Sequence, residues 1–162
     1  MKKLFTIAAA VLLAVSSFAQ DGRSLYNKFS DEPGVSAVFI SPSMFKLIGK
    51  IPAIELGDGG ERVDITPIIK SLKGFYLISC DNESQASKLR ADIKKYVNAG
   101  DFELMMEAKD SGETVRILTS GDDDIIQSFV MTVTGESETT FISMDGLISR
   151  KDFERLMEAA TN

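Results

Sequence analysis

A change in the spacing of apolar residues at Phe102 constrains the fold more than any other feature of this sequence. From Phe102 onward, apolar and polar side chains alternate, as they do in strands with one buried face. Connections rich in glycine, aspartate and serine interrupt the alternation at 110–112, 121–124 and 135–137. The pattern therefore predicts four consecutive antiparallel strands, at 102–108, 114–119, 125–134 and 138–144.

Apolar spacing and capping residues divide the first part of the chain into helices and two strands. Ser41-Pro42 and Thr66-Pro67 each combine a capping residue with a proline that favours the first helical turn. Gly74 is expected to end the helix that starts at Thr66. The expected elements are helices at 23–29, from 42, from 66, across 85–98 and from 149, and strands at 35–40 and 75–80.

These elements predict the fold class. The intervening helices are long enough for strands 35–40 and 75–80 to pair in parallel, and the four later strands extend the sheet. We therefore expect an α+β fold, with a two-layer, mostly antiparallel mixed sheet of about six strands and helices packed mainly on one face.

The N-terminal residues have the layout of a secretory signal peptide. Two lysines precede the apolar run from Leu4 to Val15, and Ser17 and Ala19 are the small residues that a signal peptidase reads. We expect cleavage before Gln20, which leaves a single α+β domain at 20–162. The apolar run is shorter than the roughly 20 residues that span a bilayer.

The residues after the expected cleavage site predict a soluble product. No cysteine follows the small residue, so the lipid attachment of a bacterial lipoprotein is not expected. We expect no stable membrane insertion after cleavage, and a periplasmic or secreted location. Loss of the two leader lysines changes the formal net charge from −6 to about −8. This charge disfavours binding to nucleic acid.

The composition removes several kinds of catalytic chemistry. The chain has no histidine and one cysteine, which excludes Ser-His-Asp and Cys-His arrangements, histidine-bearing zinc sites and internal disulfides. Cys80 ends an apolar run and is interpreted as a buried strand residue. A carboxylate pair remains open by composition, but no spacing singles one out. We expect a non-enzymatic protein with no cofactor.

Three motifs suggest binding chemistry. Residues 145–153 resemble the second half of a calcium-binding loop, but Phe141 falls on its first ligand position, which favours a strand, a turn and a capped helix. The acidic turn 122–124 and the glycine-rich loop 57–60 leave open a small-ligand or cation-binding module. The glycine-rich loop lacks the Lys-Ser or Lys-Thr ending of a phosphate-binding loop.

An uncovered sheet face is the other candidate site. If helices cover one face only, apolar side chains on the other would form a contact surface for an unknown envelope protein partner. The candidate residues are Met105, Leu118, Phe129 and Met131.

The sequence also resembles a known family. The runs that carry the resemblance are Lys28-Phe29-Ser30-Asp31, Gly34-Val35, Val38, Ile40-Ser41 and Met44-Phe45. They are similar to the opening signature of domain-of-unknown-function family 4252, and the later strand, long helix and meander follow in the same order. The resemblance implies an exported envelope protein of Bacteroides-type bacteria, with relatives encoded near sigma-factor systems. It implies no catalytic residues.

Overall fold

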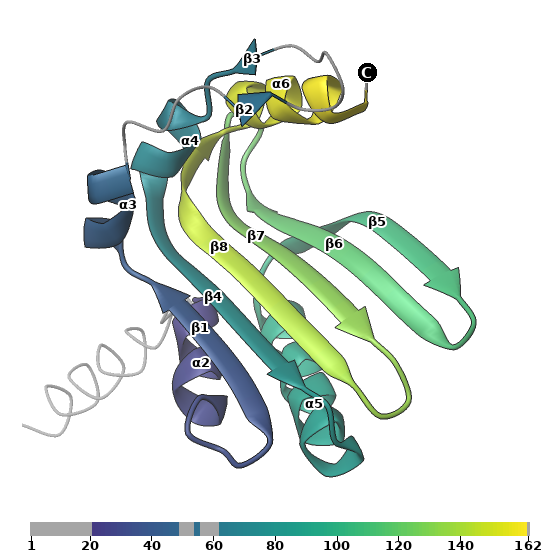
Figure 1. Cartoon of the computed structure of the whole chain (residues 1–162). Coiled ribbons are helices and arrows are strands. Elements are labelled where there is room, and N and C mark those ends of the chain that lie inside the picture. The colour runs from purple at the N-terminus through teal and green to yellow at the C-terminus, as the bar shows by residue number, and fades with distance from the viewer. Residues whose placement is uncertain (1–20, 49–53, 56–61, 162) are drawn as a thin grey trace, which may run out of the picture.

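The computed structural model describes residues 21–48, 54–55 and 62–161 and has a six-stranded sheet as its centre (Figure 1). The strand order is β1-β4-β8-β7-β6-β5, and every neighbouring pair is antiparallel. The expected α+β fold and the meander of four strands are confirmed. The strands are β1 (Val35–Ile40), β4 (Leu72–Cys80), β5 (Phe102–Asp110), β6 (Glu113–Gly121), β7 (Ile125–Thr134) and β8 (Thr139–Ser149).

The predicted parallel pairing of the first two long strands is wrong. β1 and β4 are antiparallel neighbours, with Val35 opposite Cys80 and Ile40 opposite Phe75. A parallel pair requires a connection that returns along the full length of the strands. Here the connecting helices stay at the end of the sheet where β1 finishes, so the chain enters β4 at that same end (Figure 1).

Two helices cover one face of the sheet along its length: α2 (Gly22–Phe29) and α5 (Glu83–Ala99), behind the sheet in Figure 1. The Asn82 side chain caps α5 by accepting a hydrogen bond from the backbone N–H of Gln85 at 2.9 Å. The apolar stripe of α5, formed by Ala86, Leu89, Ile93 and Tyr96, is buried. The core between these helices and the sheet contains Leu25, Phe29, Ile78, Cys80, Ala86, Leu89, Ile93, Tyr96, Leu118, Val130 and Phe141.

The other three described helices form one end of the molecule: α3 (Pro42–Ile48), α4 (Thr66–Ser71) and α6 (Arg150–Thr161). The short pair β2 (Ile54–Glu55) and β3 (Arg62–Val63) lies beside them (Figure 1). The expected cap is present, because Ser41 Oγ accepts the Met44 N–H at 3.2 Å. This end has its own core of Phe45, Leu72, Ile126 and Ile148, packed against partly buried Ile40, Ile68, Ile69, Phe75, Phe129, Met144 and Phe153.

Gly74 does not end α4, as its position in the sequence suggested. The helix ends at Ser71, and Gly74 lies within β4, next to an irregularity in the pairing with β8. A Cβ atom at Gly74 would lie 2.5 Å from the Tyr76 hydroxyl oxygen. The glycine therefore leaves room for a large side chain two residues further along the same face.

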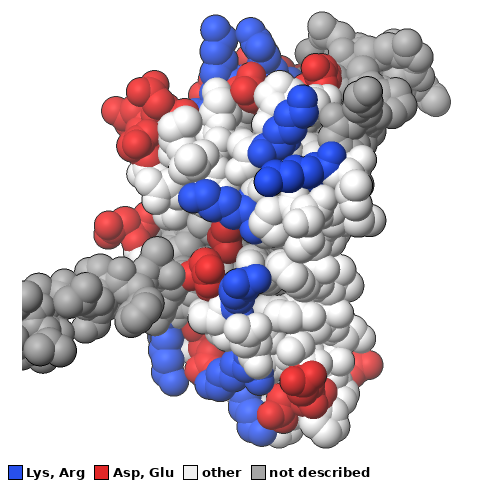
Figure 2. Space-filling view, turned by 90° about the vertical axis from the view of Figure 1, so that its left-hand side faces the viewer, with Lys and Arg blue, Asp and Glu red and all other residues white. Residues whose placement is uncertain are grey.

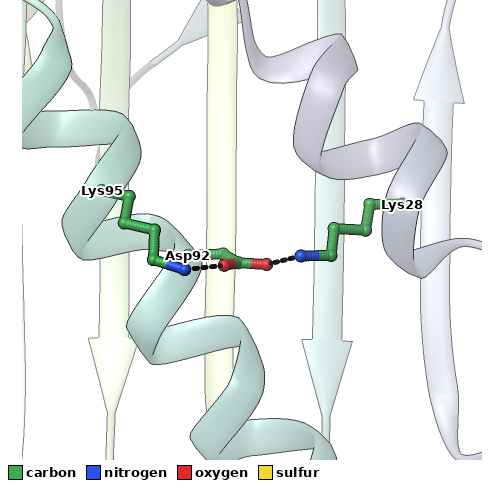
Figure 3. A network of polar contacts seen from close by, with 3 residues as sticks. All are labelled: Lys28, Asp92 and Lys95. Atoms are coloured by element: carbon green, nitrogen blue, oxygen red, sulfur yellow. Dashed lines mark hydrogen bonds and ion pairs between the residues drawn. The ribbon is translucent and has the colours of Figure 1, made fainter.

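A charged cluster on the outer surface joins the two helices of the long core (Figure 3). Lys28 of α2 and Lys95 of α5 both form ion pairs with the carboxylate of Asp92, the second at 3.3 Å. The hydrogen bond from Lys28 is the main cause that holds the pKa of Asp92 below its usual value. Exposed ion pairs of this kind contribute little individually, so the buried core remains the main source of stability.

Candidate functional sites

The sheet has one face that helices cover only at one end. The side chains of Phe75, Met144 and Phe129 are neighbours across β4, β8 and β7, and they pack beneath the helical end. The ring of Phe129 lies 5.5 Å from that of Phe153 on α6. Two residues further along each strand, the side chains on this face lie beyond the helices, because side chains alternate between faces. We call this exposed area the open face.

A row of apolar side chains crosses the open face from one edge of the sheet to the other. The register places one member on each of the six strands, and each is directly opposite the next. At the two ends of the row, Val38 is 46% exposed and Met106 is 45% exposed. The four central side chains are half-buried by their neighbours. This middle row consists of Val38, Leu77, Ile142, Met131, Ile117 and Met106.

A second row lies further from the helical end. Its side chains are smaller, and none of them is buried. The hydroxyls of Ser79 and Thr140 hydrogen-bond each other at 3.0 Å, so these two polar groups have partners within the sheet. This outer row consists of Ser36, Ser79, Thr140, Val133, Val115 and Ala108.

Neither row contains a charged residue, although a quarter of the chain (26%) is charged. Figure 2 looks onto the β1 side of the molecule, where charged side chains are spread over the surface. Uncharged atoms make up most of the right-hand outline in that view, which is the side of the open face. The apolar middle row beside an uncharged outer row makes the open face a candidate contact surface.

The structure separates the four residues expected to form the contact surface. Phe129 and Met131 lie on the open face, but Phe129 is partly covered by the helical end. Leu118 is 6% exposed and belongs to the core on the opposite face. Met105 is 51% exposed and lies at the irregularity in β5 between Leu104 and Met106. Only two of the four therefore share one surface.

The sequence reasoning missed Ile117, which is the neighbour of Met131 on the open face. A shift of one residue along a strand moves a side chain to the opposite face, so Leu118 points into the core. It also missed Leu77 and Ile142, because an apolar strand gives no local sign of which face lacks a helix. The signal that was present is the alternation itself, followed in register from strand to strand.

A cleft on the helix-covered face forms a second candidate site. Its volume is about 1020 Å³, and it lies where the start of α2 meets the end of α5 and the strands β7 and β8. The lining mixes positive, negative and neutral polar groups. Among the lining residues are Asp21, Arg23, Lys73, Tyr76, Ser128 and Asp145.

Asp145 is the most unusual group in this cleft, because it is a carboxylate only 8% exposed. Its oxygens accept hydrogen bonds from Ser128 Oγ at 2.7 Å, Ser143 Oγ at 3.1 Å and the backbone N–H of Gly22 at 3.0 Å. Burial raises the pKa of Asp145, and these hydrogen bonds oppose the effect. Burial, with the nearby Asp145 as the second cause, also raises the pKa of Tyr96 to about 12.

The contact between Asp145 and Gly22 also positions α2. The side chain of Asp21, the residue before the helix, does not cap it. The carboxylate of Asp145 accepts the first helical N–H instead. A Cβ atom at Gly22 would lie 2.6 Å from Cβ of Ser143, so glycine permits the close approach of helix and strand. A negative group at a helix N-terminus is favourable. Asp145 therefore has a structural role in the described fold.

The motifs considered for metal binding have other roles where the structure describes them. Residues 139–149 are a continuous strand, not a calcium-binding loop. In the acidic turn, the carboxylate of Asp122 accepts the N–H groups of Asp124 at 3.0 Å and Ile125 at 2.8 Å. No group of three or more potential ligand residues is arranged for a metal ion within the described ranges. The loop 57–60 lies outside the described residues.

Cys80 lies in the core, as the sequence suggested. Its side chain is fully buried, and burial raises the pKa of the thiol. A nucleophilic cysteine requires the opposite change and access to solvent.

The fold and the two sites define an α+β protein with an antiparallel sheet, one face of which is closed by helices and the other largely open. The chain belongs to the family described as "Domain of unknown function (DUF4252)", whose sequence model matches residues 26–156. This confirms the resemblance seen in the sequence. Searches of curated proteins and of solved structures each gave no significant match. In the part of the chain that the structure describes, no helix has the length and apolar character needed to cross a membrane.

Proposed function

We propose that this is an exported, soluble, non-enzymatic protein of the cell envelope that acts through protein–protein contacts made by its open face. The observation that carries the proposal is the middle row, in which all six strands contribute an apolar side chain to one continuous exposed surface. Sheets are stable in proteins when both faces are covered or one face is polar. The open face meets neither condition in the isolated chain.

Two features of the sequence support the remaining parts of the proposal. The secretory-type leader favours export, and the strongly negative charge after its removal favours solubility. The lack of histidine and the burial of Cys80 remove histidine- and cysteine-dependent catalysis, which favours a binding role.

Site-specific photo-crosslinking in intact cells tests the contact surface. A photoreactive phenylalanine analogue in place of Val38 or Met106 replaces an exposed side chain, so the fold is retained. We expect cross-linked protein adducts from these two positions. Leu104 is the matched control, since it is 52% exposed but lies opposite Leu118 on the helix-covered face. Adducts of equal yield from all three positions, or none from Val38 and Met106, would contradict the proposal.

A second candidate function is small-ligand binding in the cleft, favoured by the buried carboxylate of Asp145 beside groups of both charges. Thermal denaturation with panels of amines, sugars and divalent cations tests it. A ligand at about 100 times its dissociation constant stabilises by roughly 2.7 kcal/mol. We expect Asp145→Asn to remove a shift caused by binding in the cleft, and Asp122→Asn to remove one caused by binding at the acidic turn. A panel without shifts contradicts both.

A further inference from the structure

We propose that the open face is closed by a second copy of this chain, so that two sheets pack face to face as a symmetric dimer. This inference rests on the proposed function, because it names the partner of the same surface. It follows from three properties of the described residues: the absence of charge in the middle and outer rows, the complementary sizes of these rows, and the area they offer.

The absence of charge selects for an uncharged partner surface. The middle and outer rows together place twelve side chains on the face, and none is charged. A partner with charged groups would lose their hydration without gaining an ion pair, which costs several kcal/mol per ion. A second copy presents the same two uncharged rows, which Glu103 and Asp110 flank on β5. The pairing of Ser79 with Thr140 removes a further need for polar groups from the partner.

The helical end limits how two copies can face each other. The helical end packs on the same side of the sheet as the open face, next to it, since Phe45, Phe75 and Phe153 belong to one cluster on that side. A two-fold axis parallel to the strands would bring both helical ends together and hold the sheets apart. An axis parallel to the rows places them at opposite ends, so each copy's helices stand beside the free end of the other sheet.

With the axis parallel to the rows and between them, the middle row of one copy lies over the outer row of the other. Large side chains then face small ones. Leu77 lies over Ser79 of the second copy, and Ile142 lies over Thr140. At the edge, Met106 lies over Ala108. Packing of large against small side chains fills the space between two sheets about 10 Å apart.

The area fits a reversible dimer. Six strands about 4.8 Å apart make the face roughly 29 Å wide, and the two rows take up four residues of each strand, which gives about 14 Å of length. Each copy therefore contributes about 400 Å², or about 800 Å² for the pair, which is below the roughly 1,000 Å² of a standard specific interface and fits only a weak one. The helical ends add to this area. We expect association that depends on protein concentration.

Sedimentation velocity of the chain without its leader, over a roughly hundredfold range of concentration, tests the dimer. We expect a shift from monomer to dimer as the concentration rises. Met131→Glu should weaken association at least roughly a hundredfold, because two carboxylates become buried without partners. Val38→Glu changes a side chain that is 46% exposed in the monomer and should weaken association without affecting the fold. Leu104→Glu is the matched control, because Leu104 is 52% exposed on the helix-covered face, and it should dimerise like the wild-type protein.

Distances between spin labels test the orientation of the copies. With labels on Val38→Cys, the proposed axis places the two positions about 12 Å apart, whereas an axis parallel to the strands places them about 26 Å apart, before the label length is added. Cys80 is buried and does not react.

A monomer at every concentration, or a dimer that both glutamate variants leave unchanged, would overturn the proposal. If the protein is a monomer at every concentration, photo-adducts formed with a different protein from the analogue at Met106 would still support the proposed contact function. The dimer and the contact function can therefore be refuted separately.

Discussion

Replacement of Asp145 tests how the cleft and helix α2 are held together. Asp145→Ala removes the acceptor of three buried hydrogen bonds, from Gly22, Ser128 and Ser143. A buried donor that loses its partner costs roughly 1–3 kcal/mol, and the two hydroxyls can turn to other acceptors in the cleft. We therefore expect the free energy of unfolding to fall by about 3 kcal/mol, a large part of the roughly 5–15 kcal/mol of a typical domain.

Asp145→Asn separates hydrogen bonding from charge. Asparagine has the same shape, and its oxygen can accept the N–H of Gly22 while its amide donates to the serine oxygens. The serine hydroxyls rotate to suit this arrangement. We expect this variant to lose less stability than Asp145→Ala, because all three groups keep a partner.

The pH dependence of the two proteins should also differ, with a defined sign. Burial raises the pKa of Asp145 in the folded protein above its usual value of 3.8, so the folded state binds a proton more readily than the unfolded state. The stability that this group contributes therefore decreases as the pH rises from 3.8 through the raised pKa. Asparagine does not titrate. The stability of the wild-type protein minus that of Asp145→Asn should fall across this range.

Urea denaturation followed by circular dichroism, at a series of acidic to neutral pH values, measures all three proteins. Other carboxylates titrate equally in each protein and cancel in the difference. A loss below about 0.5 kcal/mol for Asp145→Ala would refute the prediction that its three buried hydrogen bonds stabilise the fold. A constant difference between the wild-type protein and Asp145→Asn at all pH values would refute the assigned effect of burial.

Three further predictions concern the core and the helix contacts. Phe141→Ala removes a fully buried ring that contacts the ring of Tyr96 at 5.7 Å, and should cost about 3–5 kcal/mol in chemical denaturation, whereas Leu47→Ala at a side chain 82% exposed should change stability by less than about 0.5 kcal/mol. Asp92→Asn removes the ion pairs between α2 and α5 (Figure 3) and should cost less than about 1 kcal/mol at neutral pH. Because the pKa of Asp92 is lowered, its contribution is present above the usual value of 3.8 and lost as the pH falls through the folded pKa, so the two proteins should become equally stable in acid. The thiol of Cys80 should react with a maleimide in denaturant but not in the native protein, and rapid native labelling would contradict its burial.

The local elements of this protein follow from its sequence, because short-range physics determines them. The alternation after Phe102 requires strands, and the turn residues between them require antiparallel neighbours. The start of α3 follows from the hydroxyl of Ser41, which satisfies a helical N–H group. The stripe of α5 and the burial of Cys80 follow from apolar spacing in the same way.

Asp145 marks where sequence reasoning stopped short. It shares its side of β8 with buried Phe141 and Ser143, and a charged residue at a core-facing position of a strand is a sign of a special environment. That sign becomes meaningful only once α2 is placed. Gly22 lies 123 residues away in the sequence, and their hydrogen bond depends on how a helix packs on the sheet.

The tertiary structure alone decided which apolar residues form the open face. Leu118 and Ile117 are both apolar and adjacent, and nothing local shows which of them faces α5. The register between strands makes that choice, since a shift of one residue exchanges the two faces of a strand. The direction of β4 was also decided by the tertiary structure. The connecting helices stay at the end of the sheet where β1 finishes, so β4 starts at that end and runs antiparallel to β1. The sequence thus determined the strands and helices, whereas long-range packing determined which face was left open.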